Sequence, residues 1–227
     1  RVAPPACRLV YKHGFHAGNT ADCLKHTCLV LLLQAMKAKA KPFVYVDTHS
    51  GAGVYDLSGD EAAMLREHDA GIGLLRRAAS NGNNVPDAVS TLLSICGEDE
   101  HYYPGSPLIA SSLCRSDDAL LLCERAEDQH ARLLSCMHGD ERCTVLQADG
   151  YKAVRDRQAS PHVGKTRAFV LIDPPYQFGS DTEQIARLVE HLSTHWRSAR
   201  VAVWYPITRD TAKVERLYKM VKAASPF

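Results

Sequence analysis

Short apolar runs alternate along the chain with longer segments of helical period. The runs are rich in leucine, β-branched and aromatic residues, which is typical of strands buried on both faces of a parallel sheet. The predicted strands occupy residues 43–47, 119–124, 144–147, 169–172 and 200–206. The predicted helices occupy residues 20–39, 56–79, 86–95, 107–115, 126–137, 151–158, 182–196 and 210–224. This alternation predicts an α/β fold with a Rossmann-like, doubly wound parallel sheet.

Two segments depart from simple alternation. A helical segment over 11–40 precedes the first strand, and a helical insertion of about 55–100 follows it. The leading helix is predicted to be amphipathic, with apolar residues at helical spacing: Leu24, Cys28, Leu31, Leu32 and Ala35. Lys25 and His26 interrupt it, and the sequence leaves open whether they are solvated or bind a ligand.

Composition places the whole chain in one folded unit. A chain of 227 residues with 45% hydrophobic and 23% charged residues fits a single domain over 1–227. No apolar run approaches the roughly 18 residues of a membrane span, so no membrane association is expected. We expect a cytoplasmic protein, or an organellar one if the source is eukaryotic. Because the chain opens with Arg1 rather than Met, the sequence leaves open whether a targeting segment precedes it.

The net charge and the cysteines limit the kinds of partner and metal site that the chain can be expected to have. The net charge of +1 is no global basic signature, so a polyanion would have to meet a local patch. The eight cysteines form no CxxC pair and no zinc-like spacing with histidine. They are predicted to be small buried residues in a reducing compartment, and no metal site is expected.

Asp173, Pro174, Pro175 and Tyr176 follow the apolar run 169–172 directly. Proline cannot continue a central strand, so Asp173 is predicted at the carboxyl end of the strand, where open α/β sheets bind ligands. A carboxylate, carbonyls left free by proline and an aromatic face together suit an exocyclic amine on a flat heterocycle. Asp173 and the Pro174 carbonyl would accept the two N–H bonds of the amine, and Tyr176 would stack on the ring.

Acidic residues also end the first three predicted strands, at Asp47, Glu124 and Asp149. A carboxylate after the second strand can accept from both hydroxyls of a ribose. The first strand leads into a turn with glycines at 51 and 53, which lets a ligand approach the backbone closely. The spacing is neither GxGxxG nor a Walker loop, so it gives little support to an oxidoreductase with a nicotinamide cofactor.

Together these motifs resemble the class I S-adenosylmethionine-dependent amino-methyltransferases, and in particular the RlmJ family. The closer resemblance rests on short motifs at residues 15–19 (FHAGN), 24–26 (LKH), 47–53 (DTHSGAG), 103–107 (YPGSP) and 204–206 (WYP), whereas residues 173–176 (DPPY) are typical of the wider class. The resemblance covers nearly the whole chain from Tyr11 to Pro206. It implies S-adenosylmethionine as cofactor and methylation of N6 of an adenine in 23S-type ribosomal RNA, free or partly assembled, by a monomer.

The resemblance also implies roles for matching positions. The implied cofactor-binding residues are His26, His49, Ser106, Glu124, Asp149, Gly150 and Asp173. Asp173 matches the catalytic acid of the family as well. Tyr11 and His13 match the segment that helps to hold the target adenosine, and Lys25 matches a basic residue near the active site.

One departure from the class I pattern is visible. The class I sheet normally ends with a further strand pair after the fifth strand, and the sequence predicts no such pair here, which would leave the fifth strand as an edge. The residues leave two other functions open. One is methylation of adenine N6 or cytosine N4 in DNA, which shares the Asp-Pro-Pro-Tyr motif, and the other is RNA binding by an inactive, truncated paralogue.

Overall fold

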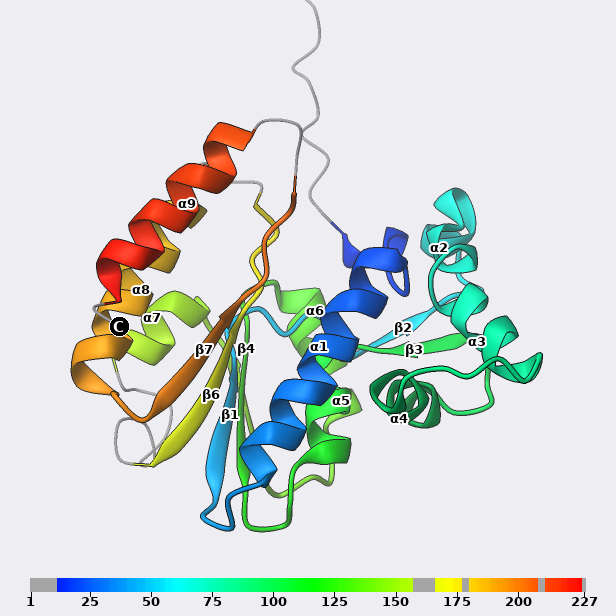
Figure 1. Cartoon of the computed structure of the whole chain (residues 1–227), viewed down its shortest axis with the longest axis horizontal. Coiled ribbons are helices and arrows are strands. Elements are labelled where there is room, and N and C mark those ends of the chain that lie inside the picture. Colours follow the sequence, from blue (N-terminus) through cyan, green and yellow to red (C-terminus); the bar gives the residue numbers. More distant parts are fainter. Residues whose placement is uncertain (1–11, 157–165, 177–179, 208–210, 226–227) are drawn as a thin grey trace, which may run out of the picture.

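A five-stranded parallel sheet forms the centre of the computed structural model, which describes residues 12–156, 166–176, 180–207 and 211–225 (Figure 1). Its strands are β1 (Phe43–Asp47), β4 (Ala119–Glu124), β5 (Cys143–Gln147), β6 (Arg167–Ile172) and β7 (Ala199–Val203). They lie in the order β5-β4-β1-β6-β7, and every neighbouring pair is parallel. The strand order therefore reverses beside β1, which confirms the predicted doubly wound sheet.

Helices cover both faces of this sheet. On one face are α1 (Thr20–Lys37), α5 (Ser106–Leu113) and α6 (Glu127–Cys136), which share a core with alternate residues of the strands such as Tyr45 and Phe169. On the other face are α7 (Gly150–Arg155), α8 (Asp181–His195) and α9 (Thr211–Ala224), which pack on the intervening residues such as Val46 and Val170. Burial on both faces explains why the central strands are continuously apolar.

Helix α1 forms as predicted, but its periodic apolar stripe is not its buried face. Leu24 and Leu31 are 59% and 54% exposed, and the other members, Cys28, Leu32 and Ala35, are exposed too. The buried face carries Leu29, Val30 and Leu33 in its second half and Asp22, Lys25 and His26 in its first. The first half of α1 thus buries polar side chains, which points to a site beside the sheet.

The insertion is less helical than the sequence predicts. The predicted helix over 56–79 is divided into α2 (Asp60–Leu65), a 3-10 turn η2 (Glu67–Asp69) and α3 (Ile72–Ser80). Arg66 ends α2 in the left-handed region, at φ 49°. Gly71 precedes α3 where a Cβ would lie 2.0 Å from the Gly18 carbonyl oxygen, so no larger residue fits there. Helix α4 (Asp87–Cys96) follows.

A short antiparallel pair frames the insertion. Strand β2 (Val54–Asp56) pairs with β3 (Tyr102–Pro104), although the sequence predicts no strand at either place. The pair brings the end of the insertion back beside the loop after β1, because the Gly105 N–H donates to the Gly53 carbonyl oxygen at 2.8 Å. The insertion therefore returns the chain to α5 at the carboxyl edge of the sheet.

Some predicted boundaries change. Strand β7 ends at Val203 rather than 206, and no further strand pairs with its outer edge in the described part of the chain. Helix α7 ends at Arg155, and residues 157–158 of its predicted range lie outside the described residues. Cys28 is exposed, contrary to the expectation of buried cysteines. Within the described ranges no helix is both long and apolar enough to cross a membrane.

Candidate active site

The four acidic residues predicted at strand ends meet at the carboxyl edge of the sheet. Asp47 ends β1 and Glu124 ends β4, while Asp149 caps α7 just after β5 and Asp173 follows β6. Since β1 lies between β4 and β6, these carboxylates line one continuous edge at the point where the strand order reverses. This is where open α/β sheets bind ligands.

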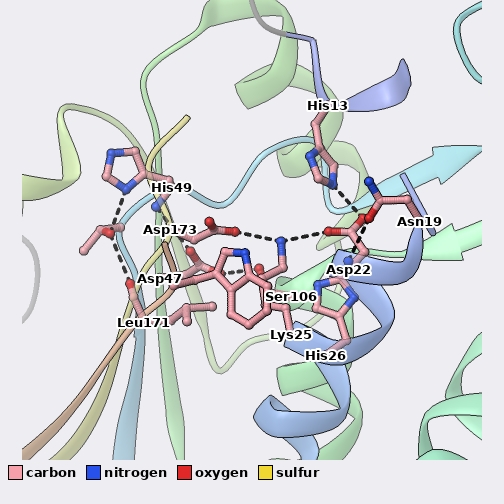
Figure 2. A network of polar contacts seen from close by, with 12 residues as sticks. His13, Asn19, Asp22, Lys25, His26, Asp47, His49, Ser106, Leu171 and Asp173 are labelled. Carbon is pink, nitrogen blue, oxygen red and sulfur yellow. Dashed lines mark hydrogen bonds and ion pairs between the residues drawn. The ribbon is translucent and has the colours of Figure 1, made fainter. Parts of the chain in front are cut away.

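Lys25 reaches this edge from α1 and pairs with the acid after β6. Its Nζ lies 2.7 Å from Oδ2 of Asp173 and 2.9 Å from Oδ1 of Asp22, so the ammonium sits between two carboxylates (Figure 2). Burial alone would lower the pKa of Lys25, but the charges of Asp22 and Asp173 outweigh it and raise that pKa above its ordinary value. Lys25 is therefore a permanent cation that fixes one oxygen of Asp173.

Asp22 also binds the segment before α1. Its Oδ2 accepts a hydrogen bond from Nε2 of His13 at 2.9 Å and another from the Gly18 N–H at 3.0 Å. Burial favours the neutral acid, but the charges of His13 and Lys25 outweigh it and hold the pKa of Asp22 well below its usual range. A carboxylate only accepts, so Nε2 of His13 carries the proton that it donates.

Asp47 is fully buried beneath the loop after β1. Its Oδ2 accepts from the hydroxyls of Ser106 at 2.6 Å and Tyr45 at 2.8 Å, and its Oδ1 accepts from the His49 N–H at 3.2 Å. Burial raises its pKa to about 6, although the hydrogen bonds from Ser106 and Tyr45 oppose the shift. Asp47 thus fixes the start of α5 relative to the loop, and Ser106 has its hydroxyl committed to that contact.

His49 is linked to the backbone of β6 through Thr48. The Thr48 hydroxyl lies 2.8 Å from Nδ1 of His49 and 3.1 Å from the Leu171 carbonyl oxygen, and when it donates to that carbonyl it accepts from Nδ1. Burial lowers the pKa of His49 to about 4, which keeps the ring neutral at physiological pH. Its Nε2 is then an acceptor at the carboxyl edge.

His26 lies on the buried face of α1. Its ring stacks on Tyr103 with centroids 5.4 Å apart, and Nδ1 lies 2.8 Å from the Tyr103 hydroxyl. Burial and the neighbouring Lys25 charge lower its pKa to about 3. His26 is therefore a neutral side chain that joins α1 to the end of the insertion.

Glu124 is fixed by backbone groups. Its Oε2 accepts from the Gly51 N–H at 2.9 Å and its Oε1 from the Ala126 N–H at 2.7 Å. Each carboxylate oxygen keeps a further lone pair, so the group can still accept from a ligand. Asp149 is held similarly, since it accepts from the Lys152 N–H at 3.2 Å as the N-cap of α7.

Gly150 serves close packing between two elements. A Cβ on it would lie 2.1 Å from the Thr48 carbonyl oxygen, so α7 can approach the loop after β1 only without a side chain here. We expect Gly150→Ala to destabilise the protein by about 3 kcal/mol, at the upper end for overpacking, because backbone must move. Gly59→Ala is the matched control, since its Cβ would meet nothing closer than 3.5 Å. Urea unfolding of both variants measures the difference, and equal midpoints would contradict the close approach.

The Pro-Pro-Tyr segment is anchored at its tyrosine. Tyr176 adopts a left-handed φ of 54°, which is costly for an aromatic residue, and its hydroxyl donates to the Trp204 carbonyl oxygen at 2.7 Å. Its half-buried ring packs against the core on the α8 side, while Pro174 before it is buried. The predicted substrate residue Tyr11 lies outside the described residues.

Sequence reasoning missed Asp22, Tyr103 and Tyr45 as partners of the predicted site residues. An acid at i and a lysine at i+3 usually form a pair on a solvated helix face, so the spacing of Asp22 and Lys25 carries no signal of burial. The tyrosines carry no polar pattern of their own either. No cluster of three or more potential metal ligands lies among the described residues.

The five-stranded order and an acid-lined site at the reversal point define a Rossmann-like methyltransferase fold. Comparison with known proteins gives the family. A family model described as ribosomal RNA large subunit methyltransferase D, RlmJ, matches residues 40–225. The chain belongs to this RlmJ family, as its resemblance in sequence predicted.

Relatives match over most of the chain. It is 36% identical over 217 residues to ribosomal RNA large subunit methyltransferase J of Haemophilus influenzae, covering 95% of this chain and 76% of the relative. It is 35% identical over 204 residues to the protein of that name from Escherichia coli, covering 88% and 70%. A crystal structure of a Legionella pneumophila protein superposes with a TM-score of 0.82 at 29% identity and covers 92% of this chain and 76% of that one.

Proposed function

We propose that this enzyme transfers a methyl group from S-adenosylmethionine to N6 of an adenine in large-subunit ribosomal RNA. The observation that carries the proposal is the fixed carboxylate of Asp173, held by Lys25 at the edge where the sheet binds ligands. Membership of a ribosomal RNA methyltransferase family supports the reaction class and the substrate.

The residues at the carboxyl edge fit the cofactor. S-adenosylmethionine combines a sulfonium and an ammonium with one carboxylate, and an edge lined by Asp47, Glu124, Asp149 and Asp173 suits a ligand of net positive charge. When bound, it supplies an electrophilic methyl group. Glu124 would accept from the ribose hydroxyls through its remaining lone pairs. The neutral His49 would present Nε2 as an acceptor for an ammonium.

The other proposed cofactor residues act through their contacts. Asp149 would contribute its second carboxylate oxygen, and Gly150 would let α7 lie close to the loop after β1, which keeps Asp149 at the edge. Ser106 and His26 would shape the pocket from its α5 and α1 side, because the Ser106 hydroxyl is bound to Asp47 and Nδ1 of His26 is bound to Tyr103. Their contribution to affinity is then smaller than that of Glu124.

Asp173 would orient the amine rather than act as a strong base. The lone pair of N6 is delocalised into the adenine ring, so the amine is a weak nucleophile. Lys25 occupies Oδ2 of Asp173 and leaves Oδ1 for one N–H of the amine, while the Pro174 carbonyl would accept the other. That arrangement favours a pyramidal nitrogen with its lone pair aimed at the methyl group, so catalysis is mostly orientation and electrostatics.

The target base would leave its stack to reach this edge. Tyr176 would contact the base from the side anchored on Trp204, and the segment with Tyr11 and His13 would border the opening from the other side. Lys12 is the exposed cation of that segment, paired with Glu61 at 3.0 Å. Such sites recognise RNA through shape, phosphates and unstacked bases.

One experiment tests the proposed function directly. The protein is incubated with labelled S-adenosylmethionine and unmodified large-subunit rRNA, and the labelled nucleoside is identified after digestion. We expect N6-methyladenosine at one position. A parallel arm offers DNA oligonucleotides, and label in DNA with none in RNA would establish the DNA amino-methyltransferase instead.

Glu124→Gln tests the ribose contact. Gln cannot accept with both ends as a carboxylate does, so we expect the Kd for S-adenosylmethionine to rise about 10- to 100-fold, which corresponds to the roughly 1.5–3 kcal/mol of a charged hydrogen bond. Glu127→Gln in the first turn of α6 is the matched control. Calorimetry measures both variants, and equal affinities would place the ribose elsewhere.

A further inference from the structure

Asp22 joins two parts of the molecule that the proposed reaction needs together. It is 3% exposed, and its two oxygens have different partners. Oδ1 accepts from Lys25, whereas Oδ2 accepts from His13 and from the Gly18 N–H. One carboxylate therefore binds both the segment before α1 and the lysine that holds Asp173.

The position of Asp22 is itself fixed by the start of α1. Asn19 caps the helix, and its side chain accepts from the Asp22 N–H at 2.9 Å. Lys25 lies one turn further along the same helix, and its ammonium lies between the carboxylates of Asp22 and Asp173 (Figure 2). The cap fixes the backbone of Asp22, and His13 with the Gly18 N–H fixes its carboxylate, so Asp22 sets where the Lys25 ammonium lies.

We propose that Asp22 is a positioning residue for methyl transfer. Through its contacts with His13 and Lys25, it links the position of the segment around His13 to the orientation of the Asp173 carboxylate. The inference rests on the proposed function for its reaction. Asp22 touches neither the reacting amine nor the methyl donor in this role. It divides the Lys25 ammonium between two carboxylates, so Asp173 is oriented without being fully neutralised.

Loss of the Asp22 charge has two physical consequences. Lys25 then has only Asp173 as its acidic partner, which makes Asp173 a weaker acceptor for the amine. An asparagine at this position has one oxygen for the donors that the carboxylate accepts from, so the contact of the 3-10 turn η1 (His13–Phe15) with α1 through His13 is weakened as well. Both changes lower turnover, while Glu124 and Asp149 still bind the cofactor.

The test compares Asp22→Asn with Asp118→Asn in the full chain. Asp118 is an equally buried aspartate, 2% exposed, that accepts from the Phe43 N–H and pairs with Arg115 at the amino end of the strands. Both variants lose a buried charge of comparable environment, so both lose stability. We expect only Asp22→Asn to lower kcat on rRNA, by about 10-fold or more, with S-adenosylmethionine affinity within about 2-fold of wild type.

A double-mutant cycle shows whether Asp22 acts through Lys25. In a Lys25→Met background we expect Asp22→Asn to lower kcat by less than about 3-fold further, because the Lys25 ammonium through which Asp22 acts is absent. Hydrogen exchange in the peptide over residues 12–19 should rise in Asp22→Asn and stay unchanged in Asp118→Asn. If Asp22→Asn does not fold, Asp22→Glu replaces it, because it keeps the charge paired but displaces the carboxylate by one methylene.

The outcomes separate the two hypotheses. A wild-type protein that methylates no RNA contradicts the proposed function, and exchange over residues 12–19 then decides only whether Asp22 holds the segment around His13 in place. Wild-type kcat per folded molecule in the Asp22 variant overturns the positioning role. So does an undiminished effect in the Lys25→Met background, or unchanged exchange over residues 12–19.

Discussion

Asp173→Asn is expected to lower the rate of RNA methylation at least about 100-fold while the protein stays folded, a loss typical of removing one group that stabilises developing charge. Asparagine keeps the size of the side chain and can still accept from Lys25 through its oxygen. Its amide group, however, would face the substrate amine with N–H bonds and cannot accept from it. The substitution therefore removes the proposed contact with little change in packing.

Single-turnover methylation of rRNA measures this effect at saturating cofactor. Asp156→Asn, an exposed aspartate just after α7, is the control for a change of one surface charge and should leave the rate unchanged. Melting temperature and cofactor affinity are measured on the same preparations. A folded Asp173→Asn protein with near-wild-type turnover would remove Asp173 from the mechanism.

The sheet follows from the sequence because its central strands are buried on both faces. Runs such as 43–46 and 119–123 are continuously apolar and too short for a typical helix, which is typical of strands in a parallel sheet. The acids that end them then fall on one edge by topology alone. The parallel sheet and the location of the site at its carboxyl edge could therefore be predicted without coordinates.

The insertion could not be predicted at the same level. Strands β2 and β3 have three residues each, and so short a pair shows no alternation that separates it from a turn or a helix. The break at Gly71 depends on a contact with the loop before α1, the close approach to Gly18. The pattern of apolar and polar residues along the insertion does not indicate such contacts.

The orientation of α1 shows where local pattern and function conflict. Its apolar stripe faces outward, and its first half buries Asp22, Lys25 and His26 instead. The sequence left the roles of Lys25 and His26 open because polar residues on a helix are usually solvated. Conflicts of this kind are expected at functional sites, where burial of charge is compensated by partners distant in sequence, here by Asp173.

Lys25→Met is expected to destabilise the protein by about 3 kcal/mol at neutral pH and to abolish most methylation, because removal of one partner of a buried ion pair leaves uncompensated charge. The methionine fills the volume of the lysine stem, but Asp22 and Asp173 then face each other without a cation. Lys37→Met in the last turn of the same helix is the matched control and should change stability by less than about 0.5 kcal/mol.

The pH dependence of this loss has a definite sign. Asp22 has its pKa depressed in the folded protein, so its paired charge stabilises the fold above the unfolded pKa of roughly 4, and this contribution is lost as pH falls. Lys25 has its pKa raised, so its contribution is complete below the unfolded pKa of roughly 10.4. The difference between wild type and Lys25→Met should therefore be largest between about pH 5 and pH 10, and it should shrink below about pH 4. Urea unfolding at pH 3.5, 7 and 9 would be used to measure it, and a difference that is equal at all three values would show that lost packing, rather than charge, causes the destabilisation.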